Sequence, residues 1–580
     1  MVVAYFVLGL IAYGPALTHI SSRLFSITGD FSLWIWMMSW TTHAVTHGLN
    51  PFFSNALFVP TGLNLAENTS APLLSLLTMP TSWLWGPIVS ANLVMVVAMP
   101  ISATSAFVVL RKWRVWWPAA ALGGLAYGFS PYMIGQAAGH PQLLVVPIPP
   151  LIALSLSRVV QRSGSPTRLG IELGLLVAAQ FLISPEILAT TALFAALALG
   201  YLALRRIDAF REGARSIARS SGIAALTITL IIAYPVWMML AGPQHFVGPT
   251  IPAVNYFHND LWSSIIPGPL QQVSFGKQFL GNPGINYTEA GGYLGIAVLA
   301  AVVILAWRGR RSVRMQLAVL LLLASLVLAL GPHLQVGGHL TGLPLPFIVL
   351  DHLPLVDNIL PSRINFEVGA CAAAVIAFGL DDVHNRPVPR HRLGTSGHTR
   401  TRLAAVAAAV VLVALVATQL PRWPYQSRTV SVLPTAIRQA VPAGDPVAIT
   451  FPYVMTNLEP QPLIWQADDG FAFRMLGGRA DHPDKDGKAT TTPAPMSPPQ
   501  LQQFLAAEDN DPLVSYGGSP AVTKQLLVEV RKVLDVYRVR LVIVDRAVRG
   551  GDQVTSMFTS ALGPPKVSSG EFRLWADWKR

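Results

Sequence analysis

Asp30 is the residue of this chain best placed to do chemistry, because it is a single acid in a segment that is otherwise rich in aromatic side chains. A carboxylate there can take a proton from a hydroxyl group, or bind a divalent metal ion through its oxygens. The alternative is structural, since aspartate is a good N-cap for a helix starting at Phe31. Trp34, Trp40 and His47 follow it. Tryptophan rings can stack on a sugar, but they also form belts at membrane interfaces.

Four further candidates stand at the edges of apolar runs: Arg23, His140, Glu186 and Arg363. A guanidinium matches phosphate geometry with two donors, so Arg363 is the leading phosphate ligand and Arg23 a weaker one. Arg363 can instead be an interfacial anchor. His140 can bind phosphate or a metal, or can be a structural histidine.

Glu186 lies in a very short turn between two apolar runs, after a proline. Ionisable groups at membrane depth tend to face cavities, which makes Glu186 a candidate catalytic acid. The alternative is a helix-start residue at the water interface. His43 and His47 share one helix face by spacing, which can bind a metal. No third ligand stands at useful spacing, so a solvated helix face is the favoured interpretation.

Long apolar runs surround these groups, and segments near twenty apolar residues are the signature of membrane helices. We predict eleven spans, at residues 1–20, 88–110, 118–134, 142–157, 169–184, 187–204, 220–241, 293–307, 315–331, 366–380 and 403–419. Arginine and lysine are concentrated in every second connection between these spans. Up to residue 402, the remaining connections hold only Arg23, Lys277 and Arg363. Because cytoplasmic loops retain positive charge, the N-terminus is predicted inside and the C-terminal segment outside. An active site is therefore expected on the outer side.

Composition excludes a soluble protein. Hydrophobic residues make up 52% of the chain and charged residues only 12%, about half the usual share. The mean hydropathy is +0.48. The formal charge of +12 lies in short loops that topology already explains, so no nucleic-acid partner is predicted. The excess of arginine over lysine and the many alanines point to a GC-rich bacterial genome. The apolar runs then predict location in the bacterial plasma membrane.

Three predicted outer connections are long, at residues 21–87, 242–292 and 332–365. The first contains an apolar stretch at 73–85 that is too short and too proline-flanked to span, and we expect it to lie in the membrane interface.

The composition changes beyond residue 420. Strands are expected at Val447–Tyr453 and Arg540–Arg546, with helices at Pro499–Glu508 and Thr523–Tyr537. The predicted fold is a polytopic α-helical membrane domain at residues 1–420, followed by an extracytoplasmic α/β domain at residues 421–580.

One motif carries a resemblance. The pattern D-F-x-x-W-x-W-x-x-x-W-x-x-H-A-x-x-H-G-L-N-P-F, beginning at Asp30, resembles actinobacterial members of the GT-C superfamily of membrane glycosyltransferases. Gly128–Met133 leading to Gly139–Pro141, the segment Gln180–Glu186 and the run Leu360–Arg363 are similar to parts of the same proteins. The resemblance covers residues 1–420, with a weaker echo at 464–466 and 473–475.

The resemblance implies transfer of a sugar, arabinose or mannose, from a polyprenyl-phosphate donor to a cell-envelope polysaccharide or glycolipid, with inversion. The family's loop acid, which matches Asp30, acts as a base or as part of a metal site holding Mg or Mn. This chain departs from the family's two adjacent acids, because Phe31 follows Asp30. A second acid is expected from Glu67, Glu186 or Asp351.

Two other functions fit a chain of this kind. A transporter or flippase of a lipid-linked intermediate would show charges along the middle of several spans and related halves, and the sequence has few such charges and no repeat. A non-catalytic scaffold that binds envelope polymers would leave the acid-bearing loop unexplained.

Overall fold

The computed structural model describes residues 1–248, 257–274, 287–352, 359–385, 397–454, 460–492, 494–509 and 521–578. Lys277 lies outside the described residues. Helices dominate the chain before residue 420: α1 (Val2–Tyr13), α2 (Gly29–His47), α3 (Pro72–Lys112), α4 (Trp117–Gly128), α5 (Pro131–Gln136), α6 (Pro141–Leu144), α7 (Ile148–Gln161), α8 (Pro166–Phe181), α9 (Pro185–Arg205), α10 (Ile207–Ala241), α11 (Ile296–Gly309), α12 (Val313–Ala329), α13 (Phe347–Leu350), α14 (Asn365–Asn385) and α15 (Gly397–Gln419).

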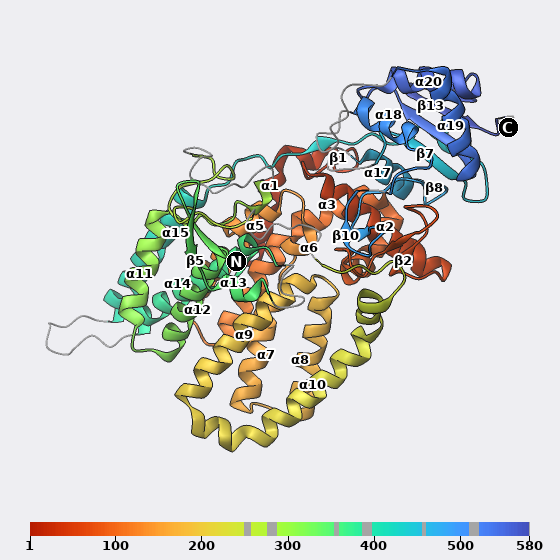
Figure 1. Cartoon of the computed structure of the whole chain (residues 1–580). Coiled ribbons are helices and arrows are strands. Elements are labelled where there is room, and N and C mark those ends of the chain that lie inside the picture. Colours follow the sequence, from red (N-terminus) through yellow and green to blue (C-terminus); the bar gives the residue numbers. More distant parts are fainter. Residues whose placement is uncertain are drawn as a thin grey trace. The chain divides into compact units, whose positions relative to one another are not determined.

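Every one of the eleven predicted spans is helical (Figure 1), although two of them are broken, into α4 and α5 and into α6 and α7. Within the described residues, six helices are long and apolar enough to cross a membrane: Val2–His19, Pro72–Lys112, Pro141–Gln161, Pro185–Arg205, Phe210–Ala241 and Pro361–Asn385. Shorter apolar helices lie at Ile296–Gly309, Val313–Ala329 and Ala405–Gln419. The number eleven and the sidedness of the loops stay predictions.

Serine–proline pairs set where several of these helices begin. Ser130, Ser165 and Ser184 are N-caps, and each is followed by a proline in the first turn of α5, α8 or α9. A serine hydroxyl satisfies a free backbone N–H, and proline has no N–H to leave unsatisfied there. The Ser184 cap places Glu186 in the first turn of α9.

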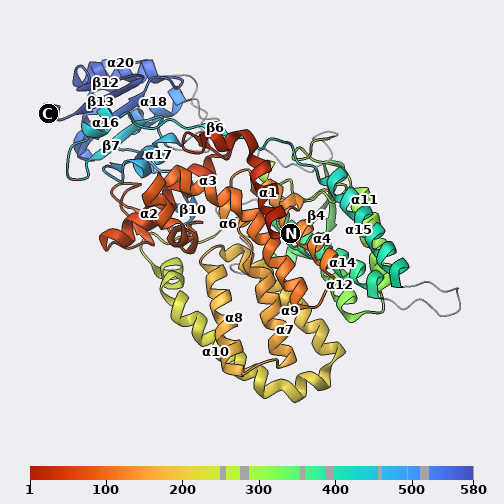
Figure 2. The same ribbon diagram turned by 180° about the vertical axis from the view of Figure 1, so that it is seen from behind.

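The chain forms two compact units that are interleaved in sequence. The first consists of Met1–Thr18, Leu93–Ala233 and Ile251–Gln426. In it α7, α8 and α9 lie side by side, and α11, α12, α14 and α15 pack around a core that includes Val375 and Met315 (Figures 1 and 2). The strands β4 (His333–Val336) and β5 (His339–Pro344) form a hairpin in this unit.

The second unit consists of His19–Asn92, Tyr234–Thr250 and Ser427–Arg580. The first long loop therefore packs with the C-terminal segment. The break between the units after Gln426 lies near the predicted boundary at residue 420. The prediction had two contiguous domains, however, and placed the first long loop in the N-terminal one. Within α3, Gly86 has a φ of 84° and interrupts the helix, so the apolar stretch at 73–85 is separate from the span that follows it.

The C-terminal segment contains a five-stranded sheet in the order β12-β13-β11-β7-β8 (Figure 2). Its strands are β7 (Val447–Phe451), β8 (Arg474–Met475), β11 (Val539–Asp545), β12 (Val567–Ser569) and β13 (Phe572–Ala576). β7 runs parallel to β11 and β8, whereas β13 runs antiparallel to β11. The helices are α16 (Thr435–Gln439), α17 (Gln461–Asp468), α18 (Gln500–Asp509), α19 (Lys524–Val536) and α20 (Gly551–Leu562). The predicted α/β character and all four predicted elements are confirmed.

One short strand pair joins the first long loop to the C-terminal segment, and two further pairs lie within the loop and within the segment. β1 (Arg23–Leu24) pairs with β6 (Arg428–Thr429), and β2 (Phe53–Ser54) pairs with β3 (Leu63–Asn64). β9 (His482–Pro483) pairs with β10 (Ala489–Thr490). These pairs fix the backbone around α2, which carries Asp30.

Candidate functional site

Asp30 lies in the first turn of α2, but it is not the helix cap. The N-cap is Thr28, and the Asp30 carboxylate instead accepts a hydrogen bond from Arg479 Nη2 at 2.5 Å. The Asp30 side chain is 38% exposed, whereas that of Arg479 is only 8% exposed. The capping alternative is therefore wrong, and Asp30 combines an ion pair with an open approach from solvent.

Arg479 belongs to a segment that runs along the first long loop. This segment, Met475–His482, is called the docking arm below. Met475 N donates to Ala56 O at 2.8 Å, and Val59 N donates to Met475 O at 3.2 Å. The ring of His482 stacks on Phe58 with centroids 4.4 Å apart. Backbone pairing fixes the arm in register with the loop, so it fixes where Arg479 stands.

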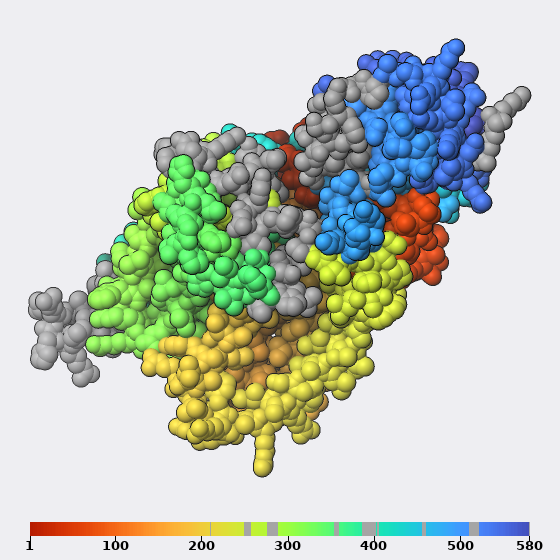
Figure 3. Space-filling model, viewed as in Figure 1, coloured from red at the N-terminus to blue at the C-terminus, as the bar shows by residue number. Residues whose placement is uncertain are grey.

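A second contact ties the end of the docking arm to the same loop. Asn68 Oδ1 accepts from Asp481 N at 2.9 Å, and Asn68 Nδ2 donates to Asp481 O at 2.9 Å. Beside it, the Glu67 carboxylate accepts from Phe246 N at 3.2 Å. Burial raises the pKa of Glu67 to about 7, with a smaller upward contribution from Asp481. In Figure 3 the C-terminal segment lies beside residues 234–248. Val247 and Lys488 form a β-bridge between them.

The tryptophans of α2 are core residues, which corrects the prediction of a sugar-stacking surface. Trp34 is 2% exposed and Trp40 is 6% exposed. Trp40 packs edge-on against Phe471 with centroids 5.3 Å apart, and Trp36 Nε1 donates to Gln466 Oε1. The burial of Trp36 and Trp40 follows from α17 packing across their face of α2. Neither Trp34 nor Trp40 has an open ring face for a sugar.

His47 is exposed, and its ring stacks on that of His43 with centroids 4.1 Å apart. Its Nδ1 lies 2.9 Å from His43 O. Among the residues that the structure describes, no group of three or more His, Cys, Asp or Glu side chains is placed to hold a metal ion. A divalent cation at Asp30 stays a prediction.

Arg363 stands in a buried ion cluster in the first unit. Its Nη1 donates to Glu186 Oε2 at 2.6 Å, while Nε and Nη2 donate to Glu289 Oε1 at 3.1 and 3.0 Å. All three guanidinium nitrogens thus donate to carboxylates. The role of Arg363 as a phosphate ligand stays a prediction, and the same ion pair engages Glu186.

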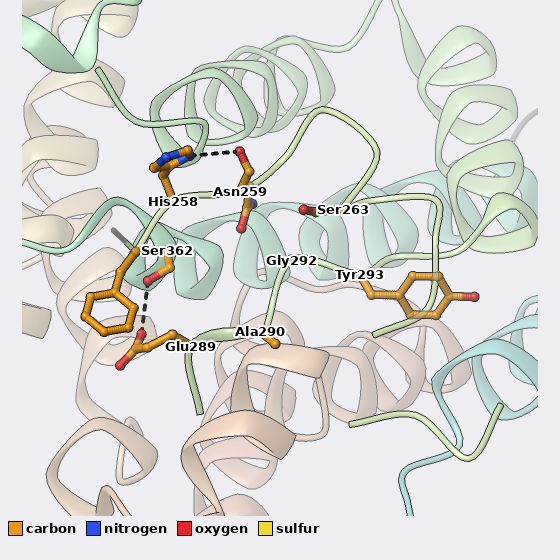
Figure 4. Close-up of a pocket in the computed structure, with 9 residues that line it drawn as sticks. His258, Asn259, Ser263, Glu289, Ala290, Gly292, Tyr293 and Ser362 are labelled. Atoms are coloured by element: carbon orange, nitrogen blue, oxygen red, sulfur yellow. Dashed lines mark hydrogen bonds between the residues drawn. The ribbon is translucent and has the colours of Figure 1, made fainter. Parts of the chain in front are cut away.

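Glu289 is a residue that the sequence reasoning missed. It ends the 3₁₀ helix Tyr287–Glu289, and its second oxygen accepts from Ser362 Oγ at 3.0 Å (Figure 4). Burial raises the pKa of Glu289, but its interactions with Arg363 and His140 outweigh burial and hold the pKa below its ordinary value. The available signal was the one used for Glu186, a lone acid just before an apolar span.

His140 and Arg23 are also engaged by the protein. His140 is 5% exposed, and its Nδ1 lies 2.7 Å from Gln136 Oε1, which fits the structural alternative. Arg23 donates from Nε to Ser427 Oγ at 2.9 Å and from Nη2 to Ser427 O at 2.8 Å, across the β1–β6 pair. Beside Glu289, a cavity of about 10 Å³ is lined by His258, Asn259, Ser263, Tyr293 and Ser362 among others (Figure 4). It has room for about one water molecule.

The family comparison matches residues 3–356 to a family described as a domain of unknown function (DUF6311). The chain belongs to this family. No curated protein matches the chain.

Solved structures show the fold. The chain is similar to the arabinofuranosyltransferase AftD from Mycobacteria, at 13% identity and a TM-score of 0.52 over 100% of this chain and 39% of that one. The chain therefore spans well under half the length of that enzyme. It is also similar to ArnT from Cupriavidus metallidurans, solved with undecaprenyl phosphate, at 12% identity over 82% of this chain and 85% of that chain, with a TM-score of 0.41. The oligosaccharyltransferase from Archaeoglobus fulgidus gives 12% identity over 97% and 70%, with a TM-score of 0.44. The likeness to AftD shows the fold of the chain and confirms the predicted polytopic α-helical architecture.

Proposed function

We propose that this protein is a membrane glycosyltransferase that moves a sugar from a polyprenyl-phosphate donor to a cell-envelope polysaccharide or glycolipid, with inversion. The observation that carries the proposal is Asp30: an ion-paired carboxylate that keeps an open side, on the first loop of a chain with the fold of a solved arabinofuranosyltransferase. Arabinose and mannose are the proposed sugars, and the site is proposed to face outward from a bacterial plasma membrane.

The chemistry assigns Asp30 the role of general base. Its carboxylate accepts the proton of an acceptor hydroxyl while that oxygen attacks the anomeric carbon from the face opposite the phosphate. The bond between the anomeric carbon and the phosphate oxygen breaks, and polyprenyl phosphate leaves with the electron pair. The product is a glycoside of inverted configuration, and Asp30 returns its proton to solvent.

The leaving phosphate needs a positive partner. Arg363, Arg23 and His140 are each held by protein groups here, which disfavours them as direct ligands. A divalent cation is the alternative: Asp30 would then hold Mg or Mn, together with substrate phosphate oxygens and water, in place of acting as the base. Loss of activity on chelation, restored by added Mg or Mn, would support the cation; full activity in chelator would exclude it.

The test is transfer of a labelled sugar from polyprenyl-phosphate arabinose or mannose by the full chain in nanodiscs. Asp30→Asn keeps the size of the side chain but removes the base, and we expect transfer to fall by about 10²- to 10⁴-fold. Asp486→Asn, which changes an exposed acid of the same unit, is the matched control and should transfer normally. Full transfer by Asp30→Asn would remove Asp30 from catalysis. Movement of the donor lipid across liposomes without any transfer would instead favour a flippase.

A further inference from the structure

Two arginine–aspartate pairs of the second unit differ in how they are exposed. In the pair of Arg438 and Asp468, the cation is 35% exposed and the acid 23% exposed. In the pair of Arg479 and Asp30, the cation is 8% exposed and the acid 38% exposed. A surface ion pair has both partners in water, whereas this one presents only its acid. The buried guanidinium is thus placed behind the open carboxylate.

We propose that Arg479 is a positioning residue of the reaction: the docking arm carries its guanidinium to Asp30 and holds that carboxylate aimed at the acceptor hydroxyl. The inference rests on the proposed function and deepens it, because it makes the C-terminal segment part of the reacting apparatus. Arg479 contacts neither substrate in this proposal and acts through Asp30.

The backbone of the docking arm is built for close contact with the loop. A Cβ added at Gly478 would lie 2.7 Å from the ring of Phe58. A side chain at this position would force the arm off the loop. The hydrogen bonds of Met475 on one side of Arg479 and of Asp481 on the other then fix the arm at both ends.

The geometry predicts the effect of changing Arg479. Loss of orientation should lower kcat, since the base would no longer be held in reach of the hydroxyl proton. KM should change little, because Arg479 contacts neither substrate in this proposal.

The experiment measures kcat and KM for the full chain in nanodiscs, with Arg479→Gln and Arg479→Lys beside the control Arg438→Gln. We expect Arg479→Gln to lower kcat about ten-fold or more while KM stays near the wild-type value. Arg479→Lys keeps a cation beside Asp30, so its kcat should fall less than in Arg479→Gln. Arg438→Gln should change neither quantity.

Distinct outcomes separate this inference from the proposed function. Retained transfer by Asp30→Asn would overturn both. Loss of transfer in Asp30→Asn, with a wild-type kcat in Arg479→Gln, would overturn only the positioning role. Equal kcat losses in Arg479→Gln and Arg479→Lys would show a purely structural arginine. If Arg479→Gln does not fold, a raised KM with an unchanged kcat in Arg479→Lys would equally contradict the proposal.

Discussion

The Arg363 cluster and the Asp30–Arg479 pair both combine guanidinium and carboxylate groups, but they differ in whether the carboxylate is exposed to solvent. Around Arg363, two carboxylates share one guanidinium. All three side chains are largely buried, with Arg363 and Glu186 each 17% exposed and Glu289 2% exposed. At Asp30, one guanidinium is buried behind a carboxylate that remains open. The first arrangement joins three segments of the first unit, and the second leaves an acid available to a substrate. Both sites contain an ion pair, and the exposure of the acid distinguishes them. A buried acid holds segments together, whereas an exposed acid can meet a substrate.

The largest effect on stability is expected at the Arg363 cluster. Arg363→Met removes the shared cation and leaves Glu186 and Glu289 buried without it. Breaking a buried ion pair from one side typically costs about 3–5 kcal/mol, so thermal unfolding of the purified protein should show a large loss. The triple variant with Glu186→Gln and Glu289→Gln should recover most of it, because no uncompensated charge remains.

Arg158→Met is the matched control for that measurement. Its pair with Glu172 is about one-third exposed on each side, at 33% and 30%. An exposed pair contributes only about 0–1 kcal/mol. Equal losses in Arg158→Met and Arg363→Met would break the distinction between a buried cluster and a surface pair.

A smaller effect is expected at the docking arm. Gly478→Ala places a methyl group 2.7 Å from the Phe58 ring, and overpacking of this kind typically costs about 1–3 kcal/mol. If the arm delivers Arg479, the variant should lose activity together with arm contact, which hydrogen exchange at Met475 and Asp481 would report. Gly570→Ala, with open space around its Cβ but strained backbone, controls for a general loss of stability in the same unit. Unchanged exchange and full transfer in Gly478→Ala would contradict the tight fit.

The smallest effect concerns pH and Glu67. Its folded-state pKa of about 7 lies above the ordinary value of 4.5, so the folded state binds this proton more tightly than the unfolded state does. The stabilisation is complete below the ordinary value and is lost as pH rises through about 7. After allowance for partial exposure, we expect about 1 kcal/mol or less. The melting temperature of the wild type should therefore fall between these pH values, and that of Glu67→Gln should fall less steeply. Equal slopes in the two proteins would exclude Glu67 as the source.

The sequence by itself determined the elements of this protein. Apolar runs near twenty residues long have no alternative to a helix in a bilayer, and serine–proline pairs mark where those helices begin, so the eleven predicted segments are all helical. Alternation and turn residues likewise placed β7, β11, α18 and α19 within one or two residues. Asp30 was recognisable because a lone acid in an aromatic loop is chemically conspicuous.

Only the tertiary structure decided what each of these groups touches. Arg479 is 449 residues from Asp30, and Glu289 is 74 residues from Arg363; neither pair shares a periodicity or a motif. Trp34 and Trp40 were predicted to form a binding surface because one-dimensional patterning cannot show that tertiary packing buries both rings. Side-chain partners depend on how distant segments pack, and packing is decided by the sum of many weak contacts that no local pattern records.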